Sequence, residues 1–232
     1  MANNCCNSRQ PLDLSHPVPA EANAFVDRLH GLLDGKPKDE ATVSSALADF
    51  EGLFDKIAAG LYSLASMLVG EGEDSIRLVE TTVANAEVSA CDDAEEARHS
   101  SRRVLATAAL ELIASRDPGS LAAPEGLEHA QTCIEDDDLD AAGVSREVLD
   151  RMMAGPDRGR VRAWLESLPA SLRTIFVLRA VAGFPAGETA FLLAEHGGPK
   201  AAGWTADAVR ELFRQGLCSL ASQLIQAGID GQ

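Results

Sequence analysis

The sequence is poor in basic and in aromatic residues. Lysine and arginine number 20 against 36 aspartates and glutamates, and the net charge of −16 excludes a protein that binds nucleic acid through a uniformly basic surface. A basic patch on one module remains compatible with this charge. Aromatic residues make up only 4% of the chain, and their scarcity favours helix over sheet, because strands draw heavily on aromatic side chains.

Long apolar runs are missing as well. No stretch of 18 apolar residues occurs, so we expect no membrane-spanning helix. Residues 1–20 are polar and lack an apolar core, so we expect a disordered tail rather than a secretory signal. The cysteines are odd in number and scattered, which predicts no disulfide framework and a cytoplasmic location. They are Cys5, Cys6, Cys91, Cys133 and Cys218.

Signatures of catalysis are also missing. The sequence contains no glycine-rich phosphate loop and no Gly-x-Ser-x-Gly motif, and its five histidines are scattered. His129 and Cys133 stand four residues apart but lack the further ligands that a zinc site requires. We therefore expect a protein that is not an enzyme and that holds no cofactor and no metal.

Helical periodicity is what the sequence does contain. Apolar residues recur at helical spacing in eight segments, and a ninth, short helix is expected at 145–153. The eight segments are 21–33, 41–69, 73–88, 92–115, 157–167, 170–181, 186–195 and 205–225. Trp164 lies at an apolar position and is expected in the core. The predicted fold is all-α, with two helical bundles joined by a polar linker.

The charge divides the chain into modules of different character. Residues 155–232 contain eight basic and seven acidic residues and so net +1, whereas the first 154 residues net −17. Residues 117–156 contain the acidic run 135–138 and are predicted to be a linker. We expect a tail at 1–20, a helical domain at 21–116, this linker, and a second helical domain at 157–232. Only the last is neutral enough to approach phosphate groups.

The segment 168–220 has the order helix, tight turn, helix, loop, helix. Gly183, Phe184 and Pro185 supply the turn, and Thr205 is placed to cap a final helix that carries Arg210 and Arg214. This order is typical of a helix-turn-helix unit, in which one helix enters the major groove while the others clamp it.

In this segment the sequence resembles the sigma-70 family of bacterial transcription initiation factors, and more closely its extracytoplasmic-function type. The residues that match the promoter-reading module, region 4, are Leu168, Pro169, Arg173, Ile175, Phe176, Leu178, Arg179, Gly183, Glu188, Thr189 and Ala190. Arg210 keeps a basic position of the recognition helix. Leu212 and Gln215 stand where the family often has arginine.

A second resemblance lies upstream, to the polymerase-binding module, region 2. The matching residues are Gly70, Asp74, Leu78 and Val79, and Arg77 replaces an acidic residue of the family pattern. The resemblance implies that residues 21–116 bind core RNA polymerase and present the −10 promoter element. The implied polymerase contacts are Asp74, Arg77, Leu78 and Glu80. An anti-sigma factor is a further candidate partner.

The resemblance also implies DNA contacts. Arg210 or Arg214 would contact bases from the face that begins at Thr205 and reads the −35 element. Phosphate contacts would come from Arg173, Arg179 and Lys200. Arg102 and Arg103 are candidates for a further contact, although pairing with Glu95 and Glu96 on the same bundle is the favoured explanation for them. The acidic linker either lies along a basic channel of the polymerase or is plain solvated chain.

Three departures from the family pattern keep other functions open. The loop 195–204 is longer than the family's turn, no aromatic residue occurs between Tyr62 and Trp164, and the chain is acidic. Opening of promoter DNA draws on aromatic platforms and basic grooves. One alternative is a sigma-like interaction module that binds polymerase or an anti-sigma partner without promoter opening. Another is a DNA-binding regulator of a different kind that shares only the helix-turn-helix.

Overall fold

Helices are the only regular secondary structure in the part of the chain that is described. The computed structural model describes residues 59–85, 94–124, 133–155 and 158–230. The chain divides into two units, 1–57 and 58–232, and every described residue belongs to the second. The predicted all-α class is confirmed. The predicted tail at 1–20 and the helix at 21–33 lie outside the described residues.

The helices follow the predicted ones closely. Residues 59–69 are helical and complete the second predicted helix. The later elements are α3 (Glu73–Asn85), α4 (Ala94–Arg116), η1 (Asp140–Ala142), α5 (Arg146–Ala154), α6 (Arg158–Ser167), α7 (Ala170–Phe176), η2 (Val177–Val181), α8 (Ala186–His196), η3 (Pro199–Ala201) and α9 (Ala206–Asp230). Apolar periodicity thus located each of these α-helices within a few residues, the accuracy expected for fraying ends.

Local sequence explains where several helices begin. Ser145 caps α5, because its hydroxyl accepts a hydrogen bond of 3.4 Å from the N–H of Val148. Gly183 precedes α8 and adopts a φ of 79°, a backbone conformation that suits glycine. Pro185 then takes the position before the first turn of α8. The predicted turn at residues 183–185 is therefore confirmed.

One predicted helix has two parts. The segment predicted as a single helix at 170–181 consists of α7 and of η2, a π-helical turn. The wider turn is visible in the hydrogen bond of 3.0 Å from the N–H of Ala182 to the carbonyl of Val177. Arg179 lies within this turn.

The core contains an aromatic cluster from α6, α7 and α9 that is centred on Phe176 of α7. Phe176 is 1% exposed, and its ring lies 4.9 Å from that of Trp164 and 5.7 Å from that of Phe213. The Trp164 ring meets it edge to face, a favourable geometry for aromatic pairs. Trp164 is 6% exposed, so its predicted core position is confirmed.

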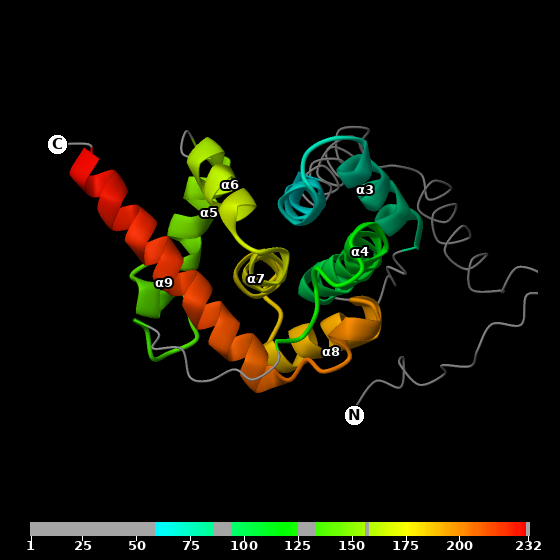
Figure 1. Ribbon diagram of the computed structural model, residues 1–232. Helices are drawn as coiled ribbons and strands as arrows, with labels where there is room; N and C mark the ends of the chain where they lie inside the picture. Colours follow the sequence, from blue (N-terminus) through cyan, green and yellow to red (C-terminus); the bar gives the residue numbers. More distant parts are fainter. Residues whose placement is uncertain (1–58, 86–93, 125–132, 156–157, 231–232) are drawn as a thin grey trace, which may run out of the picture. The chain divides into compact units, whose positions relative to one another are not determined.

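The helices pack in a continuous series. Helix α3 packs on α4, α4 on α8, α8 on α9, and α9 on α7 (Figure 1). The described part of the predicted linker also joins the core, since η1 packs on α9 and α5 on α6. Ile134, Val144 and Leu149 from this part are buried. The division into two bundles stays a prediction. Among the described residues, no helix is long and apolar enough to cross a membrane.

Candidate nucleic-acid interface

The start of α9 is held in place by its cap and by the loop before it. The hydroxyl of Thr205 accepts a hydrogen bond of 3.2 Å from the N–H of Ala208, which makes Thr205 the cap that the sequence predicts. Trp204, 6% exposed, donates from its indole Nε1 to the carbonyl of Leu121 at 2.9 Å. The long loop is therefore anchored against the segment that follows α4.

Helix α9 has a buried side and a partly exposed side. Val209, Phe213 and Leu217 are buried in the core. The side chains of Arg210 and Arg214 remain 46% and 29% exposed. Leu212, at a position where the sigma family often has arginine, is buried, so a basic residue there would cost desolvation.

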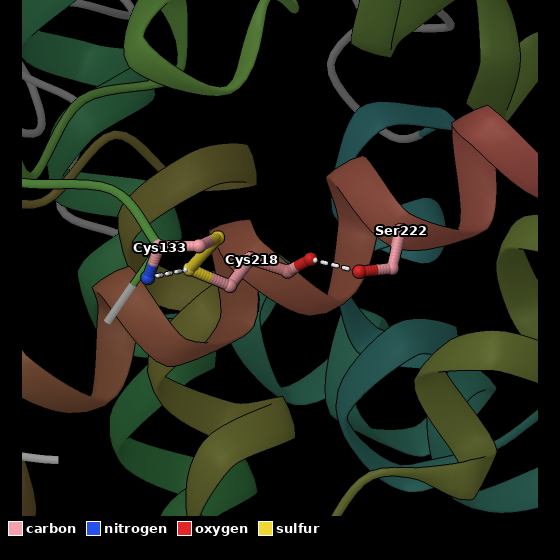
Figure 2. Close-up of a disulfide and its surroundings, with 3 residues drawn as sticks. All are labelled: Cys133, Cys218 and Ser222. Atoms are coloured by element: carbon pink, nitrogen blue, oxygen red, sulfur yellow. Dashed lines mark hydrogen bonds between the residues drawn. A yellow bond between two sulfur atoms is a disulfide. The ribbon is translucent and has the colours of Figure 1, made fainter. Parts of the chain in front are cut away.

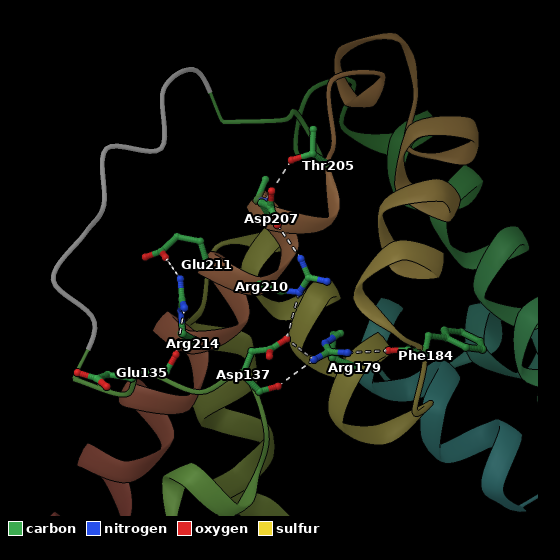
Figure 3. A network of polar contacts seen from close by, with 10 residues as sticks. Glu135, Asp137, Arg179, Phe184, Thr205, Asp207, Arg210, Glu211 and Arg214 are labelled. Carbon is green, nitrogen blue, oxygen red and sulfur yellow. Dashed lines mark hydrogen bonds and ion pairs between the residues drawn. The ribbon is translucent and has the colours of Figure 1, made fainter.

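Three arginines gather on this side of α9, and we call them the arginine cluster: Arg179, Arg210 and Arg214 (Figure 3). The sequence predicted each of them as a DNA contact, and the structure brings them together. Arg179 also lies over the ring of Phe213, with its guanidinium carbon 4.8 Å from the ring centroid. The π-helical turn η2, which extends α7, and α9 jointly build the cluster.

The acidic run covers the arginine cluster. Nη2 of Arg179 donates to the carboxylate of Asp137 at 2.7 Å and to its carbonyl at 2.8 Å. Nε of Arg210 lies 3.8 Å from the same carboxylate, and Nη1 of Arg214 donates to the carbonyl of Glu135 at 3.0 Å (Figure 3). The run is thus not plain solvated chain. It occupies the groups predicted to contact DNA.

Arg179 is the most enclosed member of the cluster. Its side chain is 16% exposed, and Nη1 donates to the carbonyl of Phe184 at 3.3 Å. Burial lowers the pKa of Arg179, Asp137 opposes the shift, and the charge of Arg210 adds to it. Because a guanidinium stays protonated in proteins, the cost of enclosing the charge is offset by the carboxylate and not by loss of a proton.

A disulfide fastens the acidic run to α9. Cys133 and Cys218 are bonded, with Cα atoms 5.7 Å apart (Figure 2). The N–H of Cys133 also donates to Sγ of Cys218 at 2.9 Å. The expectation that the cysteines form no disulfide framework is wrong for this pair, because folding brings together two residues 85 positions apart. This bond also removes Cys133 from any metal clip with His129, which lies outside the described residues.

Arg173 and Lys200, two further predicted DNA contacts of residues 157–232, lie on other elements than the three arginines of the cluster. Arg173, on α7, is half-buried, and its Nε is enclosed without a hydrogen-bond partner among the described residues. Lys200, in η3, is exposed, and its carbonyl accepts from the N–H of Ala123 at 3.0 Å. The contacts of the acidic run fall on the arginine cluster, so the structure gathers only part of the predicted set.

Arg102 and Arg103, the two arginines of α4 that were predicted as DNA contacts, contact α8 and the turn before it. Nη1 of Arg102 donates to the carbonyl of Ala182 at 3.3 Å, and burial, with the charge of Arg146, lowers its pKa. Arg103 is exposed and lies over the ring of Phe191, 5.9 Å from the centroid. Phe191 is itself 51% exposed. Arg102 thus contacts the segment 182–184, to which Arg179 also donates, whereas Arg103 lies against the exposed Phe191 of α8.

The predicted polymerase contacts lie on α3. Asp74 pairs with Arg116 of α4 at 2.6 Å, and this hydrogen bond lowers the pKa of the carboxyl. Arg77 pairs with Glu73 at 3.0 Å, and both side chains are exposed, as is Glu80. Leu78 is 6% exposed and packs inward, so it can shape this surface only from beneath.

Sequence reasoning missed the partners of the arginine cluster. Asp137, Glu135, Cys133 and Cys218 complete the site, yet the residues that they contact lie 42 to 85 positions away. The available signal was complementary charge, an acidic run upstream of a helix with two arginines. Charge alone does not determine which acidic residue pairs with which arginine.

Comparison of the chain with protein-family models, curated proteins and solved structures finds no match.

Proposed function

We propose that this chain is a sigma-like transcription initiation factor that binds core RNA polymerase and promoter DNA. The observation that carries the proposal is α9 itself. Its first turn is capped by Thr205, its apolar side is buried against α7 and α8, and its other side presents Arg210 and Arg214. A helix held in this way suits insertion of one face into a major groove.

The remaining roles follow from position and charge. Arg210 and Arg214 contact bases, whereas Arg173, Arg179 and Lys200 contact phosphate groups. Arg102 and Arg103 provide a second contact with nucleic acid. The exposed face of α3, with Asp74, Arg77 and Glu80 above the buried Leu78, docks on polymerase. The protein acts by binding and carries out no catalysis of its own.

A second function has one specific observation in its favour. Arg179, Arg210 and Arg214 already have carboxylate or carbonyl partners within the chain. A protein in which this state persists would behave as a sigma-like interaction module, which binds polymerase or an anti-sigma partner without opening a promoter.

Transcription with purified components separates these functions. Core polymerase from the source organism, genomic fragments and the full chain should yield promoter-specific transcripts. Arg210→Ala and Arg214→Ala should each lower transcript yield about tenfold, in line with the loss of one base-reading arginine. Arg151→Ala, an exposed arginine on α5, is the matched control and should leave the yield unchanged.

Other outcomes of these experiments would support one of the alternative functions or contradict the proposed one. Co-elution with core polymerase without transcription on any fragment supports the interaction module. Binding to duplex DNA without binding to polymerase supports a DNA-binding regulator of another kind. Equal losses in all three arginine variants would contradict a reading face on α9.

A further inference from the structure

The segment that covers the arginine cluster is anchored at both ends, and we call it the strap, residues 133–140. At one end Cys133 is bonded to Cys218 of α9, and the neighbouring Ile134 is buried. At the other end the chain enters η1, which packs on α9. Between these anchors the contacts with the cluster are polar: the backbone of Glu135 and the backbone and carboxylate of Asp137.

The chemistry of these contacts matches that of a bound polyanion. Arginine binds carboxylate and phosphate oxygens in the same charge-assisted way. Asp137 places one carboxylate oxygen 2.7 Å from Nη2 of Arg179 and 3.8 Å from Nε of Arg210. A nucleic acid that contacts Arg179 through a phosphate group and Arg210 through a base would need the same two guanidinium groups. The strap and a nucleic acid bound in this way therefore exclude each other.

We propose that the strap competes, within the chain, with polyanions for binding to the arginine cluster, and that the Cys133–Cys218 disulfide holds the strap in this closed position as a latch. The identity of the polyanion as promoter DNA rests on the function proposed above. The strap's acidic character, its position and its covalent latch do not depend on that function.

The latch acts through effective concentration. While the disulfide is intact, the strap is fixed to α9 at Cys133 as well as through η1, so Asp137 competes with a polyanion at a high effective concentration. Once the bond is cut, the strap loses its covalent anchor on α9 and keeps only noncovalent contacts there. The cluster's pairs within α9, Arg210 with Asp207 and Arg214 with Glu211, persist in both states.

Opening the latch is a two-electron reduction by a dithiol. A thiolate of the reductant attacks one sulfur of the Cys133–Cys218 bond and forms a mixed disulfide, releasing the other cysteine as a thiolate. The second thiol of the reductant then displaces the remaining protein thiol. The chain gains two electrons and two protons as two thiols, and the dithiol becomes a disulfide. Cys133 is exposed, which gives a reductant access to the bond.

The test measures the strap and the surface separately on the full chain. Hydrogen exchange of residues 133–142 reports whether the strap is open, and fluorescence anisotropy with labelled duplex DNA and with inorganic polyphosphate reports whether the surface is free. Reduction with dithiothreitol should speed exchange in the strap and tighten polyanion binding about tenfold. Cys133→Ser should behave like the reduced protein and should no longer respond to the reductant.

A charge variant keeps the test independent of the disulfide. Asp137→Asn, with the latch intact, should tighten polyphosphate binding about fivefold. Asp136→Asn changes the same charge at an exposed neighbour and should alter binding less than about twofold. Circular dichroism on each variant verifies that the helices are retained.

The outcomes distinguish the two proposals. The strap proposal would be overturned if hydrogen exchange in the strap and polyanion binding were the same in the oxidised and the reduced protein and Asp137→Asn had no effect on binding. Faster exchange without any gain in binding of either polyanion would also overturn it as a competitor. Tighter binding of polyphosphate on reduction, without binding of any genomic duplex, would support the strap proposal and would count against the promoter-binding function.

Discussion

The carboxylate of Asp137 accepts a 2.7 Å hydrogen bond from Nη2 of Arg179, a residue 42 positions later in the chain. Arg179 is 16% exposed at its side chain and Asp137 is 34% exposed, so the pair is only partly hydrated. Enclosing a guanidinium is costly unless an acceptor accompanies it. Asp137 therefore stabilises the turn that carries Arg179 as well as covering the arginine cluster.

The first prediction concerns the stability that this pair contributes. Asp137→Asn should lower the free energy of unfolding by about 1–2 kcal/mol, because the enclosed guanidinium loses a charged acceptor. Asp136→Asn removes an equal charge from an exposed neighbour and should change it by less than about 0.5 kcal/mol. Urea unfolding measured under oxidising conditions compares the two. Equal effects would show that the pair adds no stability.

The second prediction compares two buried tryptophans. Trp204 and Trp164 are each 6% exposed, and each donates a 2.9 Å hydrogen bond, to the carbonyl of Leu121 and the hydroxyl of Ser219 respectively. Trp204→Phe leaves a carbonyl of a fully buried residue without its donor, at a cost of about 1–3 kcal/mol.

Trp164→Phe should cost less at its hydrogen bond, because Ser219 is half-buried and its hydroxyl can rotate toward water. Chemical unfolding of both variants measures the difference. A larger loss from Trp164→Phe would mean that packing on Phe176 outweighs the hydrogen bonds.

The third prediction uses two helical glycines. A Cβ at Gly216 of α9 would meet Cδ2 of Phe176 at 3.0 Å, and Phe176 is 1% exposed between two other aromatic rings. Gly216→Ala should therefore destabilise the protein by about 1–2 kcal/mol despite the better helix propensity of alanine.

A Cβ at Gly187 of α8 would meet no atom of the described residues within 4 Å, so Gly187→Ala should stabilise the protein by about 0.5 kcal/mol. Thermal unfolding should move in opposite directions for the two variants. Stabilisation by both would show that α9 can shift away from α7.

The fourth prediction concerns acid stability. The hydrogen bond from Arg116 lowers the pKa of Asp74 below its ordinary value of 3.8. A carboxyl whose folded pKa is lowered contributes stability above its unfolded pKa, and the contribution is lost as the pH falls through the folded pKa. Asp74→Asn should therefore weaken the fall in stability below about pH 4.

Unfolding midpoints between about pH 2 and 7 measure this dependence. Glu80→Gln, which removes an exposed carboxylate from the same helix, is the control. Arg116→Ala should reproduce the effect of Asp74→Asn, because either change removes the same ion pair. If both variants lost stability at low pH as the unchanged protein does, the Asp74–Arg116 ion pair would not contribute to its acid stability.

Helix positions were predictable because the features that determine a helix and its ends lie within a few adjacent residues. The apolar spacing in α8 and α9, the turn at Gly183 and the cap Thr205 are local features, and the structure confirms them. The π-helical turn at Arg179 was not predictable, since nothing in the periodicity of 170–181 separates it from ordinary helix.

The candidate site was predictable only in part. Arg179, Arg210 and Arg214 were identified because their segment resembles a region of the sigma-70 family, a match that rests on nearby residues. Their acidic partners were not, because in an extended chain the run 135–138 can meet any basic surface with equal electrostatic gain.

Amphipathic periodicity and capping chemistry were therefore sufficient to establish an all-helical protein and the arginine-bearing face of its last helix. The pairing of Asp137 with Arg179 and of Cys133 with Cys218 emerged from the packed fold. Contacts between residues 42 and 85 positions apart depend on how the helices stack, and no short stretch of sequence encodes that arrangement.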